Sequence, residues 1–130
     1  MYVRFISSVR SRVRGVNEGI FSCAYECRDC DLTPNYLRRE IRSEINWFKE
    51  NLPVPSCQAF RDNCRRRVVV CWFKSEAEEV ISHALALRMW LNECGHNIKI
   101  VGTKQPGIVC YSDAFQVVAR PIAATPTSWG

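Results

Sequence analysis

The sequence predicts an α+β fold, a single domain in which two to three helices pack on one face of a mainly antiparallel sheet of four to five strands. Residues 68–73 (VVVCWF) are β-branched and aromatic without polar alternation, which is typical of a central strand covered on both faces. Residues 77–94 repeat apolar side chains at helical spacing, and short strand patterns follow them. The expected order of elements is β-α-α-β-α-β-β-β.

The N-terminal half supplies one strand and two helices. Residues 2–6 suit a first strand, and a helix from about Glu18 gathers apolar residues and cysteines on one face. Thr33 and Pro34 together indicate the start of a second helix, with Thr33 as its capping residue. Its narrow core stripe consists of Leu37, Ile41, Ile45, Phe48 and Leu52.

The C-terminal half begins with the central strand and the long helix. Ser75 and Glu78 have the spacing of a capping box, and Gly95 is suited to end the helix. Residues 98–101 and 108–111 flank a turn, TKQPG, so we expect them to pair as a hairpin. With a last strand at 115–119, the predicted domain spans residues 1–122. Residues 123–130 then form an extended or disordered tail.

Composition bounds the class of protein. A chain of 130 residues fits one domain, and 47% hydrophobic and 24% charged residues are ordinary for a globular protein. No apolar run approaches the roughly 18 residues of a membrane span, so we expect a soluble protein. The start of the chain, MYVRFISSVRSRVR, lacks the apolar segment of a secretory signal. We therefore expect a cytoplasmic protein with reduced thiols.

The basic residues concentrate in the N-terminal half. Residues 1–67 carry 13 basic and 8 acidic side chains, whereas residues 68–130 carry 5 of each, which together give the net charge of +5. The densest run is Arg65, Arg66 and Arg67, and we predict an anion-binding role for it. Nucleic-acid binding through the arginine clusters is one alternative function, although the pI near 8.9 is modest and no recognition motif is present.

Three of the eight cysteines form a C-x3-C-x2-C pattern at Cys23, Cys27 and Cys30. This spacing resembles the cluster-binding motif of the radical S-adenosylmethionine enzymes, in which three thiolates hold an iron–sulfur cluster. The resemblance covers eight residues, and the chain is too short for the large barrel-like domain of those enzymes.

Zinc is a second possibility for these thiols, with Cys57, Cys64, Cys94 or His96 as the fourth ligand. No second C-x2-C pair supports it. Free cysteine is among the most buried residue types, so the sequence favours a core role for this helix face. We therefore predict neither a metal nor another cofactor.

The long helix carries apolar residues outside its core stripe. By the 100° rule Leu85, Met89 and Trp90 point away from the side that faces the sheet. Tryptophan and methionine are typical of contact surfaces. These three residues therefore predict an interface with a protein partner or with a second copy of the chain.

Two resemblances to known families bear on function. The segments WFKENLPVP, VCWFKSEA, LNECG and FQVVARP resemble a small family of uncharacterised bacterial proteins, which implies a soluble bacterial or phage-borne domain without an established activity. The order of elements is also similar to that of the ADP-ribosyltransferases. One branch of that family places an Arg on the first strand, a Ser after an aromatic strand and a Glu on a late strand. The nearest matches here are Arg4, Ser75 and Gln116.

Gln116 departs from that pattern, because a neutral amide cannot act as a base as a carboxylate does. The two histidines, His83 and His96, have no neighbouring nucleophile and acid in any familiar motif. We therefore favour a non-enzymatic protein-binding or regulatory module over an ADP-ribosyltransferase-like enzyme or its degenerate relative. Whether the protein is an enzyme stays open at this point.

Overall fold

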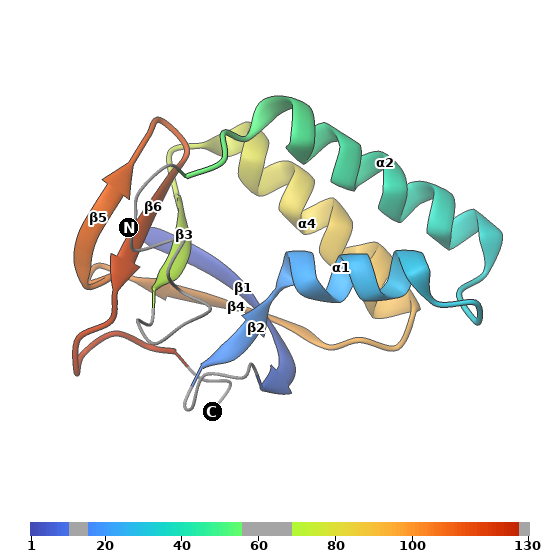
Figure 1. The fold of residues 1–130 in the computed structure, drawn as a ribbon, viewed down its shortest axis with the longest axis horizontal. Helices are drawn as coiled ribbons and strands as arrows, with labels where there is room; N and C mark the ends of the chain where they lie inside the picture. The colour runs from blue at the N-terminus through green and yellow to red at the C-terminus, as the bar shows by residue number, and fades with distance from the viewer. Residues whose placement is uncertain (11–15, 56–68, 128–130) are drawn as a thin grey trace.

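The computed structural model describes residues 1–10, 16–55 and 69–127 (Figure 1). Within these ranges three helices pack with a six-stranded antiparallel sheet, which confirms the predicted α+β class. The helices are α1 (Ile20–Asp29), α2 (Asn35–Asn51) and α4 (Glu78–Glu93). The strands are β1 (Tyr2–Arg10), β2 (Asn17–Gly19), β3 (Val70–Lys74), β4 (Ile98–Thr103), β5 (Ile108–Ser112) and β6 (Gln116–Arg120). None of these helices has the length and apolar content needed to cross a membrane.

Strand β1 holds the sheet together because three other strands pair with it. β4 lies antiparallel along one edge of β1 from Tyr2 to Ser7. The opposite edge is divided, since β3 pairs with Tyr2 and Val3 whereas β2 pairs with β1 from Ile6 onward. On its other side β3 pairs with β6, and β6 pairs with β5. The sheet therefore separates into two parts next to Arg4 and Phe5.

The predicted central position of the aromatic strand is confirmed. β3 lies between β1 and β6, and its residues Val70, Trp72 and Phe73 are buried. Successive residues of a strand point to opposite faces, so Phe73 packs on the helices while Trp72 joins a smaller cluster with Val70 and Val117.

The main core lies between the helices and the sheet. α2 and α4 run side by side, and α1 packs against both of them (Figure 1). The α2 stripe is buried as predicted at Leu37, Ile41, Ile45 and Phe48. Helix α4 buries Val80, Ala84, Leu87 and Leu91. Helix α1 contributes Ile20, Cys23, Ala24 and Cys27.

The predicted hairpin between residues 98–101 and 108–111 is wrong. β4 pairs with β1, and β5 pairs with β6. Gly107 has a φ of 112°, which agrees with the predicted turn at Pro106 and Gly107. However, β4 pairs with the free edge of β1 instead of with β5. The structure also places Asn17–Gly19 in a strand, and α1 begins at Ile20.

The helix starts differ from the predicted caps. Ala77 is the N-cap of α4, and the Ser75 hydroxyl donates to Glu76 Oε1 at 3.4 Å, so the capping box does not form. Pro34 is the N-cap of α2, while the Thr33 hydroxyl donates to the Cys27 carbonyl at 2.7 Å. Thr33 therefore stabilises the end of α1 instead of the start of α2.

The chain beyond β6 lies against the domain as far as Thr127. The Thr125 hydroxyl donates to the Gln105 carbonyl at 3.0 Å, and the Asn17 amide donates to the Thr127 carbonyl at 3.0 Å. Residues 123–127 of the predicted tail are therefore held by hydrogen bonds at both β2 and the turn before β5.

Candidate metal centre

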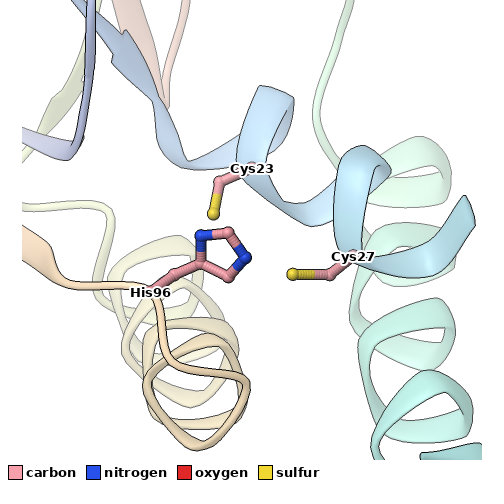
Figure 2. Close-up of side chains that lie close together, drawn as sticks. All are labelled: Cys23, Cys27 and His96. Atoms are coloured by element: carbon pink, nitrogen blue, oxygen red, sulfur yellow. The ribbon is translucent and has the colours of Figure 1, made fainter. Parts of the chain in front are cut away.

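Two cysteines of α1 and one histidine from the segment after α4 form a compact group. Figure 2 shows the thiols of Cys23 and Cys27 pointing from α1 toward the imidazole of His96, which lies between them. One sulfur or nitrogen atom of each side chain lies within 4.8 Å of the other two. Cysteine thiolates and imidazole nitrogens are the ligands that zinc prefers in proteins.

Helical geometry places the two cysteines. Residues at i and i+4 lie on the same face of a helix, so Cys23 and Cys27 project side by side. Each has only 2% of its surface exposed. Both belong to the side of α1 that packs into the main core.

A tight turn brings His96 to this face. Gly95 has a φ of 91°, a left-handed conformation that glycine adopts without steric cost. Its amide donates to the Asn92 carbonyl, and the His96 amide donates to the Leu91 carbonyl, both at 3.0 Å. These bonds close the end of α4 and hold Cys94 and His96 next to α1.

Cys94 supplies a third thiol. After burial and the Cys23 thiol, the nearby Cys94 thiol also raises the pKa of Cys27. Cys94 is half-buried and follows α4 directly. Cys94 lies outside the group of Cys23, Cys27 and His96 and is a candidate fourth ligand, which would give the Cys3His combination found in structural zinc sites.

The electrostatics of the group argue against a nucleophilic cysteine. Burial raises the pKa of the Cys23 thiol to about 11, with the Glu26 carboxylate as a smaller contribution. Burial also raises the pKa of Cys27 and of Cys94. Reactive cysteines instead have lowered pKa values in electropositive surroundings. A divalent cation would reverse this preference, because thiolates bind it directly.

The spacing of the group is close to that of a metal site. Zinc bonds of about 2.3 Å to sulfur and about 2.0–2.1 Å to nitrogen place tetrahedral ligand atoms about 3.5–3.8 Å apart. The observed limit of 4.8 Å for Cys23, Cys27 and His96 therefore requires an approach of about 1 Å. Small rotations of the side chains are sufficient for such a movement.

The sequence also offers Cys30, Cys57 and Cys64 as possible metal ligands. Cys30 caps the C-terminus of α1 and does not belong to the group that includes His96. Cys57 and Cys64 lie outside the residues that the structure describes. The sequence alone identifies Cys94 and His96 only among several candidates. The C-G-H segment at the end of a helix is the signal that narrows the choice.

Arg4 and Gln116 line one cavity, whereas Ser75 does not belong to its lining in the described part of the chain. Gln116 is buried, and its Nε2 donates to the Pro53 carbonyl at 2.7 Å and to Asp113 at 3.2 Å. The structure thus brings together two of the three residues matched to the ADP-ribosyltransferases. No protein-family model, curated protein or solved structure significantly matches the chain.

The residues of the predicted interface divide into two kinds. Leu85 and Met89 are 44% and 51% exposed on α4. Trp90 is half-buried and packs against the main core, so the expectation that it points away from the core is wrong. Helix α4 rests on α1 and α2 as well as on the sheet, which gives it a wider buried side than the sequence stripe predicts. The predicted anion-binding run Arg65, Arg66 and Arg67 lies outside the described residues.

Proposed function

We propose that this protein is a non-enzymatic, zinc-binding module of the cytoplasm, in which one Zn²⁺ joins α1 to the end of α4. The observation that supports this proposal most directly is the buried group of Cys23, Cys27 and His96, with Cys94 beside it. With Cys94 as the fourth ligand, such a site would satisfy the tetrahedral preference of zinc and leave no position for a substrate. Such a closed site stabilises a fold instead of catalysing a reaction.

The ligand chemistry favours zinc over an iron–sulfur cluster. Clusters of that kind are held mostly by four thiolates, whereas the group observed here combines two thiols with one imidazole. A mixed set of thiols and one imidazole is typical of zinc. The neighbouring carboxylates of Glu26 and Glu93 add negative charge near the site.

The short helix α1 is the element that gains most from a bound metal. It has 10 residues, no side-chain cap bond at its N-terminus and no acidic residue in its first turn. Isolated helices of this length are marginal in water. A metal bound to two of its side chains would fix α1 against the C-terminus of α4.

Metal content provides the first prediction and tests the proposal. We expect purified, reduced protein loaded with zinc and then desalted to retain about one Zn²⁺ per chain by mass spectrometry of the metal. Cys27→Ser and His96→Ala should lose most of it, because three ligands bind much more weakly than four. Cys110→Ser, which alters an exposed thiol on β5, is the matched control and should retain it.

The alternative, in which the cysteines are only core residues, makes a different prediction. The wild-type chain would then retain no zinc, and Cys27→Ser would change stability without changing metal content. Either result would disprove the zinc proposal. Equal zinc content in Cys27→Ser and Cys110→Ser would also disprove it, because the bound metal would then lie elsewhere.

A second candidate function is self-association through the outer side of α4. Two neighbouring apolar side chains on this helix, Leu85 and Met89, are exposed, although its other apolar side chains are buried or half-buried. They are one turn apart at i and i+4, so they form one continuous apolar surface. We propose a second copy of the chain as the partner that covers it.

A further inference from the structure

A cavity of about 530 Å³ lies where the sheet separates, and its lining comes from β1, β3, α1 and the C-terminal end of α2. Its volume falls within the range of small-molecule sites, which is roughly 300–1,000 Å³. This cavity is on a different side of α1 from the cysteine group. None of its lining residues belongs to the cysteine group.

The walls of the cavity are largely apolar and include four phenylalanines. Phe21 of α1 and Phe48 of α2 make an edge-to-face contact with ring centroids 4.9 Å apart. Phe73 of β3 stacks on Phe48 at 6.3 Å. Val54, at the end of the lining that follows α2, is 81% exposed and marks the opening to solvent. These walls suit an alkyl or aryl group.

One cation, the half-buried Arg4, lines the cavity. Its Nη2 donates to the Asn17 carbonyl at 2.7 Å, while its Nη1 is buried without a hydrogen-bond partner in the described part of the chain. No carboxylate of residues 1–10, 16–55 or 69–127 forms an ion pair with it. Burial lowers the pKa of the Arg4 guanidinium to about 10, which still leaves it charged at neutral pH.

A guanidinium nitrogen that is buried without a hydrogen-bond partner, as Nη1 of Arg4 is, is unfavourable, and a bound anion would compensate it. The other nearby polar group is already engaged, since the Gln116 amide donates to the Pro53 carbonyl. Lys49 also lines the cavity and adds a second positive charge. The charged side chains of the cavity lining are therefore both positive, and an anion bound at Arg4 would compensate the nearer charge.

We propose that this cavity binds an amphipathic anion, with a carboxylate or phosphate head at Arg4 and an apolar body among Phe21, Phe48 and Phe73. A guanidinium forms strong, charge-assisted hydrogen bonds with both kinds of head. The head would occupy the free Nη1 of Arg4, and the body would exclude water from the aromatic walls.

Three small-molecule probes with alkyl chains of similar length test which head group binds at Arg4. Octanoate, octyl phosphate and octanol are titrated into the full-length protein by calorimetry, with the melting temperature measured in parallel. We expect saturable one-to-one binding of at least one anion, and binding of octanol about 10- to 100-fold weaker, because octanol lacks the charge-assisted bond. The stronger of the two anions identifies the head group. Absence of binding by both anions, or equal affinity for octanol, would overturn the proposal.

Arg4→Met removes the charge while retaining an apolar stem. The unliganded variant should melt at or above the temperature of the wild type, because the buried Nη1 without a hydrogen-bond partner is lost. The anion should bind it about 10- to 100-fold more weakly. Wild-type affinity in this variant would overturn the assignment of Arg4.

A second pair of variants serves if Arg4→Met does not fold. Val54→Asp places a carboxylate at the exposed opening, where it should weaken binding of the anion at least threefold by repulsion and lost apolar contact. Leu32→Asp is the matched control, since Leu32 is 90% exposed and is not part of the described cavity lining. Equal effects of the two substitutions would show that the anion does not bind in this cavity.

Discussion

Asp113 is the hydrogen-bonding centre of the turn before β6. Its carboxylate accepts bonds from the amides of Phe115 and Gln116 at 2.8 and 2.9 Å and from the Tyr111 hydroxyl at 2.8 Å. Burial alone would raise the pKa of Asp113, but these hydrogen bonds together outweigh burial and the net pKa is lowered. The ionised carboxylate is therefore the form that stabilises the turn.

The lowered pKa of Asp113 predicts the direction of a pH effect. A carboxyl group with a lower pKa in the folded state contributes stability above its unfolded pKa, and this contribution is lost as pH falls through the folded value. For Asp113 the loss occurs below roughly pH 4. We expect Asp113→Asn to lower the free energy of unfolding at pH 7 by about 1 kcal/mol, with solvent screening limiting the effect.

Urea denaturation at pH 7 and at several values between pH 5 and pH 3 measures this prediction. The stability difference between wild type and Asp113→Asn should shrink as the pH falls, because the wild-type carboxylate becomes protonated. Exposed Asp31→Asn is the control and should change stability by less than about 0.5 kcal/mol at every pH. A difference that stays constant with pH would contradict the role given to the ionised form.

Individual helices are predictable here where their apolar periodicity is strong. Residues 77–94 correspond to α4 at Glu78–Glu93, and the stripe of α2 is buried at the positions that the sequence indicates. Pairing between strands is less predictable, because β4 joins a strand that is about 95 residues away in the sequence. Strand β2 has three residues, which are too few to show a period of two.

The outer side of α4 can be tested without disturbing the core. Leu85→Glu combined with Met89→Glu changes two exposed side chains and leaves Trp90 in its half-buried contact with the core. The monomer stability should therefore change by less than about 0.5 kcal/mol per site. If a second copy covers this surface, light scattering should give a mass above 15.0 kDa for the wild type and 15.0 kDa for the double variant.

Leu32→Glu, at a fully exposed position away from α4, serves as the control and should keep the wild-type mass. A wild-type protein that stays at 15.0 kDa at high concentration would contradict self-association. A double variant that unfolds would show that the surface belongs to the monomer core.

The cysteine–histidine group at α1 and the cavity at Arg4 differ in how much of each the sequence alone predicts. The face of α1 with Cys23 and Cys27 follows from helical spacing alone. Its partner His96 follows only from the packing of α1 against the end of α4, about 70 residues later in the chain. Arg4 is visible as a basic residue on a first strand. Its burial and the cavity next to it arise from the separation of β2 and β3 along β1, which no local pattern indicates.

Helix α1 lies between the two sites and connects them. By the 100° rule three of its four cavity-lining residues, Phe21, Ser22 and Tyr25, are centred about 170° from the direction of Cys23 and Cys27, whereas Ile20 lies on the cysteine side. A metal on one side of α1 would therefore fix the position of the cavity wall on the other side. Loss of the metal leaves the wall free to move away from Phe48.

We expect chelation of zinc to lower the melting temperature and to weaken binding of the anion in the cavity several-fold, because ordering of α1 would then oppose binding. By linkage, a saturating anion must raise the affinity for zinc by the same factor. Titrations of zinc-loaded and zinc-free protein with octanoate or octyl phosphate, and zinc competition with and without the anion, measure both factors. Equal anion affinity in the zinc-loaded and zinc-free protein would show that the two sites act independently. If the change in anion affinity and the change in zinc affinity differ, a third process, such as association of two chains, takes part.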